Sequence, residues 1–216
     1  MNTNHTTPEK TIKGRPRGRP PQAMANQVRE EILTCALAVF REKGFGGSSI
    51  EGIAKRAGVS KNTIYLQFRT KEVVFEEAAK FGLANVHEQV DIEVNREASF
   101  EQAVLTIIRH IQELAADSDI RSLTRLLIAE AQRFPEIASA MHGEFRKMMK
   151  PVAKYLREAA TANALSIDDT TQAAHDLTIL ALGGFDFLLS EPENQEILSK
   201  ERAITLRDML VKGWQR

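Results

Sequence analysis

The apolar residues of this chain recur at spacings of three and four along almost its whole length. That spacing places them on one face of an α-helix, whereas the alternating runs typical of strands are scarce. The chain has 216 residues, of which 43% are hydrophobic, so it can bury one large core or two smaller ones. We therefore expect an all-α fold of nine or ten helices.

Helix caps and helix-stop residues divide the first part of the chain into four helices. The first is expected to end before Gly44, because glycine favours a helix end. The second begins at a capping box of Ser48 and Glu51, or one residue later at Ser49. The four expected helices cover about residues 26–43, 48–57, 60–68 and 71–93.

The rest of the chain continues as helices with the same apolar spacing. The expected segments are residues 99–116, 117–131, 135–160, 168–189 and 199–214. Pro151 removes a backbone donor, so we expect it to kink or divide its helix. Gly183 and Gly184 carry no side chain, so we expect them to let another helix approach closely.

Residues from about 49 to 68 carry the pattern of a helix-turn-helix. Two short helices that cross steeply need a small residue at their contact, and Ala54 provides one. Gly58 tolerates the positive φ of a tight turn, and Val59 supplies an apolar plug after it. Ser60 then caps the next helix. An ordinary helical hairpin with a solvated face is the alternative, but these residues in register favour DNA binding.

The outer face of the third expected helix is polar and rich in hydrogen-bonding groups. A recognition helix places such side chains in the major groove, where Asn62 or Gln67 can read adenine and Thr63 can touch a thymine methyl group or a phosphate. Tyr65 and Lys71 suit phosphate contacts, which set position rather than sequence. The candidate DNA contacts of this motif are Ser49, Ser60, Lys61, Asn62, Thr63, Tyr65, Gln67 and Lys71.

Charge is divided unevenly, although the whole chain has a formal net charge of zero. Residues 1–80 hold 14 Lys and Arg against 8 Asp and Glu, and the remainder holds 15 against 21. A basic first third favours contact with a polyanion. Charge alone does not separate DNA from RNA or from an anionic membrane.

Residues 1–25 are polar, lack core-forming residues and are expected to form a disordered basic arm. Within them, Gly14–Pro21 reads GRPRGRPP, which looks like an AT-hook core. A thin Arg-Gly-Arg strip held extended by prolines fits the narrow minor groove of A/T tracts. Arg15, Arg17 and Arg19 are therefore candidate minor-groove contacts, and a solvated basic tail is the alternative.

The run IEGIAKRAGVSKNTIYLQFRTKE, residues 50–72, resembles the DNA-binding domain of TetR/AcrR-type transcriptional regulators. The preceding helix matches as well, and the resemblance covers about residues 28–78. Leu66 stands where this family often has an aromatic residue, and Gln67 where it often has histidine. Because of these departures, an operator sequence does not carry over. The segment AEAQRFPEIASAMHGEF, residues 129–145, is similar to the C-terminal domain of the AefR-like branch.

The resemblance implies a homodimer that binds a palindromic operator and usually acts as a repressor. It also implies a C-terminal helical domain that binds a small, often apolar effector, with the fourth helix linking the two domains. The expected division is residues 1–25 as the arm, 26–72 as the helix-turn-helix domain and 73–216 as the effector-binding and dimerisation domain. The implied partners are double-stranded DNA, a second copy of the chain and a small-molecule effector.

Apolar residues of the C-terminal part suggest a pocket and a subunit interface. Phe134, Met141 and Phe145 are candidate pocket residues, because aromatic rings and methionine adapt to varied apolar ligands. The segment 177–189 is apolar almost all round and must be buried on both sides. A four-helix bundle between two subunits would bury it, and burial within one subunit is the alternative. The candidate interface residues are Leu182, Phe185, Leu189 and Leu206.

No enzyme signature is visible in the sequence. The five histidines are scattered and no two have metal-ligand spacing on one helix, so no metal or cofactor is expected. The single cysteine, Cys35, fits a small core residue in a reducing cytoplasm. The polar N-terminus and the lack of a long apolar span predict a cytoplasmic, nucleoid-associated protein. The alternatives are an architectural protein of A/T-rich DNA without effector control and a helical enzyme whose basic end is incidental.

Overall fold

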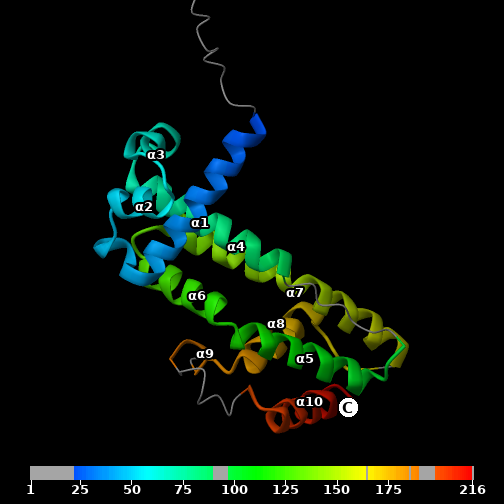
Figure 1. Ribbon diagram of the computed structural model, residues 1–216. Helices are drawn as coiled ribbons and strands as arrows, with labels where there is room; N and C mark the ends of the chain where they lie inside the picture. Colours follow the sequence, from blue (N-terminus) through cyan, green and yellow to red (C-terminus); the bar gives the residue numbers. More distant parts are fainter. Residues whose placement is uncertain (1–21, 90–96, 164, 185, 190–197, 216) are drawn as a thin grey trace, which may run out of the picture.

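The computed structural model describes residues 22–89, 97–163, 165–184, 186–189 and 198–215. Within these ranges the chain forms ten α-helices and no strand, which confirms the all-α prediction. The helices are α1 (Gln22–Gly47), α2 (Ile50–Arg56), α3 (Lys61–Phe68), α4 (Lys71–Gln89), α5 (Phe100–Ala116), α6 (Ser118–Glu130), α7 (Pro135–Asn163), α8 (Thr170–Leu182), α9 (Asp186–Leu189) and α10 (Lys200–Trp214). Figure 1 shows an elongated molecule with α2 and α3 at one end and α10 at the other, and α4 packs along α7 between them.

Side-chain caps begin most of these helices, and most are the residues that the sequence predicts. Each accepts a hydrogen bond from a backbone N–H of the first turn, which would otherwise lack a partner in the helix. The caps are Ser49 for α2, Ser60 for α3, Ser99 for α5, Asp117 for α6, Asp169 for α8 and Ser199 for α10. The cap of α8 lies one residue beyond the predicted Asp168, and the helix begins at Thr170.

Several helix boundaries differ from the sequence prediction. α1 extends to Gly47 instead of ending before Gly44, although the backbone kinks at Gly44, where φ is 68°. α1 begins at Gln22, before the end of the expected disordered arm. The segment expected as one helix over 168–189 is divided, because Gly183 and Gly184 adopt φ values of 81° and 62°. Left-handed residues end a helix, so these glycines act as a stop rather than as a site of close approach. α7, in contrast, runs through Pro151 without being divided.

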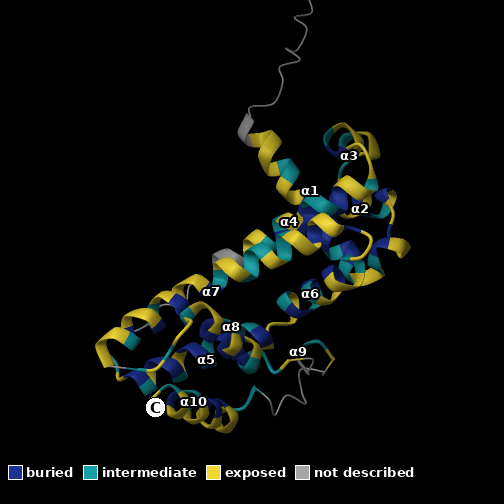
Figure 2. Ribbon diagram, turned by 180° about the vertical axis from the view of Figure 1, so that it is seen from behind, coloured by how far each residue is buried: buried dark blue, intermediate teal, exposed yellow. Residues whose placement is uncertain are grey.

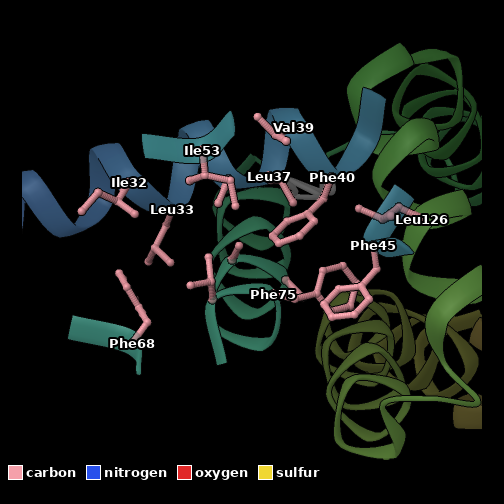
Figure 3. Packing of buried hydrophobic residues seen from close by; sticks show 14 of the residues in the cluster. Ile32, Leu33, Leu37, Val39, Phe40, Phe45, Ile53, Phe68, Phe75 and Leu126 are labelled. Atoms are coloured by element: carbon pink, nitrogen blue, oxygen red, sulfur yellow. The ribbon is translucent and has the colours of Figure 1, made fainter. Parts of the chain in front are cut away.

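One hydrophobic core joins α1–α4 to parts of α6 and α7. Figure 3 shows its buried side chains, which include Phe40 of α1, Phe75 of α4 and Leu126 of α6. Phe40 and Phe75 meet edge to face with their ring centroids 4.9 Å apart, and the rings of Phe45 and Phe134 lie 5.0 Å apart beside them. Because Leu126 and Phe134 come from the second half of the chain, the core crosses the expected domain boundary.

A second core lies between α5, α7, α8 and α10, and its positions are among those coloured dark blue in Figure 2. Ile107 of α5, Leu156 of α7, Leu177 of α8 and Ala203 of α10 are fully buried in it. The apolar stripes of four helices thus meet at the end of the molecule that lies away from α3. This core fixes the frame on which α8 and α10 present their outer faces.

Candidate functional site

The turn between α2 and α3 is held by short-range contacts that its own sequence supplies. Ser49 Oγ accepts a hydrogen bond from the Gly52 N–H at 3.1 Å, so the cap is the second of the two predicted positions. Gly58 has the positive φ that the turn was expected to need, at 64°. The Val59 N–H donates to the Ala54 carbonyl at 3.1 Å and closes the turn. The local geometry is that of a helix-turn-helix.

The inner face of α3 is fixed to the rest of the domain. Ile64 and Phe68 are fully buried in the core shared with α1 and α4. The guanidinium of Arg29 lies 4.5 Å from the centre of the Phe68 ring and pairs with the Glu77 carboxylate at 2.8 Å. Arg29 belongs to α1 and Glu77 to α4, so contacts from these two helices orient α3.

The outer face of α3 carries the side chains that were predicted to contact DNA. Lys61, Asn62 and Tyr65 are exposed, whereas Thr63 and Gln67 are half-buried. The first turn of α3 is therefore accessible to a large partner such as a DNA duplex. A helix such as α3, with one buried face and one exposed polar face, fits into the major groove and can form hydrogen bonds with the base edges there.

Some of the predicted contacts already take part in internal hydrogen bonds. Lys61 Nζ donates to Glu51 Oε1 at 2.7 Å, and this hydrogen bond lowers the pKa of the Glu51 carboxyl and raises the pKa of the Lys61 ammonium. Ser60 Oγ accepts from the Thr63 N–H at 3.1 Å and lies 2.9 Å from Thr63 Oγ1. An approaching phosphate would compete with Glu51 for Lys61.

Lys71, a predicted phosphate contact, also makes contacts within its own chain. Its Nζ donates to the carbonyls of Phe45 and Ser48 at 2.8 and 3.0 Å, and it lies 4.2 Å from the centre of the Phe45 ring. These contacts use two of the three ammonium protons. Lys71 thus positions the turn that leads into α2, a role that the sequence pattern did not reveal.

Leu66 is a surface feature that sequence reasoning missed. Its side chain is 77% exposed, beside the exposed Tyr65, although both lie on a helix that is anchored by apolar residues. The signal was available in the register, because a residue two positions after the buried Ile64 lies about 200° around the helix.

An apolar cavity of about 480 Å³ lies between the helices of the C-terminal part. It is lined by Leu83, Val86, Ile111, Leu114, Ala115, Ile120, Thr124, Ile128, Met141, Glu144, Phe145, Met148, Ile179, Leu182, Gly184, Phe187 and Leu188. Thr124 and Glu144 supply its polar side chains. The Glu144 carboxylate is also bound by Lys147 Nζ at 2.7 Å.

Two of the three candidate pocket residues line this cavity and one does not. Met141 and Phe145 lie on its α7 wall. Phe134 is only 5% exposed and lies in the other core, with its ring centroid 4.8 Å from that of Phe75. The chain just before α7 packs against α1 and α4 rather than facing α8, which is why Phe134 falls outside the cavity.

The candidate interface residues fall into three different environments. Leu189 is 76% exposed, whereas Leu206 is 5% exposed and belongs to the core of its own chain. Leu182 is half-buried and lines the cavity, and Phe185 lies outside the described residues. Ile179 of α8, which lies in the segment predicted for the interface, is exposed, and so are two apolar side chains of α10 that sequence reasoning missed, Ile204 and Met209.

The remaining sequence predictions concern the arginines of the N-terminal arm, Cys35, metal sites and membrane-spanning helices. Arg15, Arg17 and Arg19 lie outside the described residues. Cys35 is half-buried and packs against the N-terminal core. In the portion of the chain that the structure describes, no group of three or more His, Cys, Asp and Glu side chains is placed to hold a metal ion. No helix there is long and apolar enough to cross a membrane.

Two helices connect the cavity with the helix-turn-helix. α4 begins three residues after α3 and places Leu83 and Val86 on the cavity wall. α6 also lines the cavity, through Thr124. On another face of α6, Leu123 and Leu127 are buried in the core shared with α1. Two helices that line the cavity therefore also pack against the helices of the helix-turn-helix domain.

Known proteins match the chain in both of its parts. The family model of bacterial regulatory proteins of the tetR family matches residues 32–78, and that of the C-terminal domain of AefR-like transcriptional repressors matches residues 102–202. The fatty acid metabolism regulator protein of Bacillus subtilis is 30% identical over 102 residues, which are 47% of this chain and 53% of that protein. The chain spans about half the length of the first curated relatives it matches.

Two solved structures share the fold over most of both chains. A protein of Mesorhizobium loti described as a TetR-family transcriptional regulator has a TM-score of 0.77 at 23% identity, covering 89% of this chain and 98% of its own. The regulator FadR of Bacillus subtilis, solved in complex with stearoyl-CoA, has a TM-score of 0.63 at 20% identity, covering 85% and 97%. At these identities the likeness concerns the fold alone.

Proposed function

We propose that this chain, which belongs to the TetR family of bacterial regulatory proteins, is a repressor that binds a palindromic operator as a homodimer and is released by a small apolar effector. The observation that carries the proposal is the pairing of an anchored, outward-facing α3 with an apolar cavity whose walls include α4 and α6. α3 is placed to bind DNA, the cavity is placed to bind a ligand, and α4 and α6 connect the two.

The cavity favours a largely apolar effector. Its volume of about 480 Å³ falls within the range of small-molecule pockets, about 300–1,000 Å³. Met141 and Met148 can adapt their side chains to different ligand shapes. Glu144 disfavours a second carboxylate nearby, since like charges in a poorly solvated site repel. We therefore expect the part of the effector that reaches Glu144 to be uncharged or cationic.

Release from DNA follows from the position of α4. In a dimer, two recognition helices must enter successive major grooves about 34–36 Å apart. An effector that wedges against Leu83 and Val86 moves α4, and α3 precedes α4 by only a short turn. The effector need only bind the state that does not fit DNA more tightly than the state that does.

Footprinting against the DNA upstream of the protein's own gene tests the proposal. A protected palindrome of dimeric size supports it, whereas even protection of A/T-rich DNA supports an architectural role instead. Absence of protection at low salt contradicts both. Loss of the footprint is then tested with stearoyl-CoA, the ligand of the Bacillus subtilis structure, and with the uncharged octadecanol. The negative charge of Glu144 on the cavity wall favours the alcohol.

The exposed faces of α8 and α10 are the proposed dimer interface. The two helices pack against each other within the chain, and both leave apolar side chains in water, including Ile179, Ile204 and Met209. Two such pairs related by a twofold axis form a four-helix bundle that buries these side chains.

Replacing Ile204 and Met209 together with lysine is expected to shift the protein from twice its chain mass of 24.1 kDa toward that mass itself. The charges would have to be buried without partners at the interface. Light scattering after gel filtration measures the change. Thr161→Lys, on the exposed surface of α7, adds a charge elsewhere and should leave the mass unchanged. A dimer that survives the double substitution would exclude this face.

Deleting residues 1–20 is expected to weaken operator binding and to reduce its salt dependence. The logarithm of the binding constant falls with the logarithm of salt concentration by about 0.9 for each phosphate neutralised. Removing Arg15, Arg17 and Arg19 should thus lower the slope by about 2–3 for each subunit. Titrations at several salt concentrations measure both quantities. If affinity and slope both stay the same, the arm does not contact the minor groove.

A further inference from the structure

We infer that Leu66 determines part of the operator sequence by packing against the C5-methyl group of a thymine in the major groove. This inference rests on the proposed DNA-binding function of α3. Its starting point is a large apolar side chain that is 77% exposed in the last turn of α3, the second helix of the helix-turn-helix.

The register of α3 directs Leu66 toward the groove. Ile64 and Phe68 define the buried face of the helix. With 3.6 residues per turn, Leu66 points away from the midpoint of those two residues by about 180°. Asn62, one turn earlier on the same side, is also exposed. When the exposed face of α3 enters a major groove, Leu66 therefore points away from the protein and into the groove.

The chemistry of the groove leaves few partners for leucine. It neither donates nor accepts hydrogen bonds, so it cannot read a purine edge or bind a phosphate. Among the base edges of the major groove, thymine presents an apolar methyl group where the other bases present donors and acceptors. Single exposed leucines are common on protein surfaces, and the position of this one at the centre of the recognition face is what distinguishes it.

The side chains on either side of Leu66 are polar, which supports an apolar role for Leu66 itself. Lys61 and Tyr65 lie on one flank of Leu66, and Thr63 and Gln67 lie on the other. These residues supply the polar contacts, so Leu66 is free to select by shape and by desolvation alone. Its contribution should then be insensitive to salt, unlike the contribution of any lysine or arginine to phosphate binding.

Deoxyuridine scanning of the operator tests the inference, because uracil differs from thymine only by the missing methyl group. In the footprinted duplex, each thymine and its palindromic mate are replaced by deoxyuridine, and dissociation constants are measured. The wild-type chain should lose about fourfold in affinity for each methyl group in contact with Leu66, or about 15-fold for a symmetric pair. Leu66→Ala should bind the thymine operator more weakly and should no longer distinguish deoxyuridine at that pair.

Controls separate this contact from general weakening. Val73→Ala, which trims an exposed apolar side chain on α4, should keep the sensitivity to deoxyuridine. Leu66→Ala should keep the salt slope and the helical circular dichroism of the wild type, since the side chain is exposed. If the wild type binds the operator but no thymine pair is sensitive, or if Leu66→Ala stays equally sensitive, the inference is wrong. A wild type that binds no operator at all contradicts the proposed function instead.

Discussion

Replacing Phe134 with alanine is expected to lower the free energy of unfolding by about 3–5 kcal/mol. The ring is 5% exposed and lies in contact distance of two other rings, with centroids 5.0 Å from Phe45 and 4.8 Å from Phe75. The substitution removes that apolar surface and leaves a cavity that the surrounding aromatic cluster cannot fill. Urea unfolding followed by circular dichroism measures the change, at one protein concentration because a dimer's stability depends on it.

The matched control for this prediction is Phe145→Ala. Phe145 is also a phenylalanine of the α7 region, but it is half-buried and borders the open cavity. Its loss should cost about 1–2 kcal/mol, because less surface returns to water and the adjoining space already exists. Phe134→Ala should also weaken operator binding, since Phe45 leads into α2, whereas Phe145→Ala should change effector binding more than DNA binding. Equal losses of stability would contradict the view that the surrounding aromatic cluster cannot fill the space that Phe134 leaves.

Phe134 also marks the limit of what the sequence can predict. Apolar spacing, caps and stop residues are local signals, and they correctly predicted the helices, the Ser49 and Ser60 caps and the positive φ of Gly58. No local signal in the sequence decides which of the two cores an apolar residue joins. Phe134 precedes α7 by one residue and resembles Met141 in chemistry, yet the two side chains lie in different surroundings.

The same reason explains the other differences between expectation and structure. Leu206 and Met209 lie on one helix, and only packing against α5 and α8 decides that Leu206 is buried and Met209 exposed. Lys71 stays a predicted phosphate contact, but its hydrogen bonds to the carbonyls of Phe45 and Ser48 join residues more than 20 positions apart and could not be predicted from local sequence. Side-chain roles that depend on residues more than a turn away require the tertiary structure.

Gly82 is a second position where distant residues decide the outcome, and it lies at the junction of three helices. A Cβ atom built on this glycine of α4 would lie 2.9 Å from Leu37 Cδ2 of α1 and 3.1 Å from Leu123 Cδ2 of α6. Real Cβ contacts are longer, so any side chain at this position forces the helices or the leucines apart. A glycine inside a helix costs about 0.5–1 kcal/mol relative to alanine, and here the close approach offsets that cost.

Gly82→Val is therefore expected to lower the free energy of unfolding by about 1–3 kcal/mol, the usual range for overfilling a packed core. Gly143→Val is the control, because Gly143 is also inside a long helix but a Cβ there meets no atom within 4 Å. It should be neutral or slightly stabilising in the same urea titration. A Gly82→Val chain as stable as the Gly143→Val chain would mean that Leu37 and Leu123, or the helices that carry them, move aside at little cost.

The functional consequence of Gly82→Val follows from its neighbours. Leu83, the next residue, lines the cavity, and Thr124, next to Leu123, lines it from α6. Pushing α6 away from α4 at this junction changes the cavity wall and the position of α4 in the same way that we propose for an effector. Operator affinity should therefore fall in Gly82→Val, measured below its unfolding transition, and stay unchanged in Gly143→Val. If Gly82→Val is destabilised but its operator affinity is unchanged, the packing of this junction does not control DNA binding.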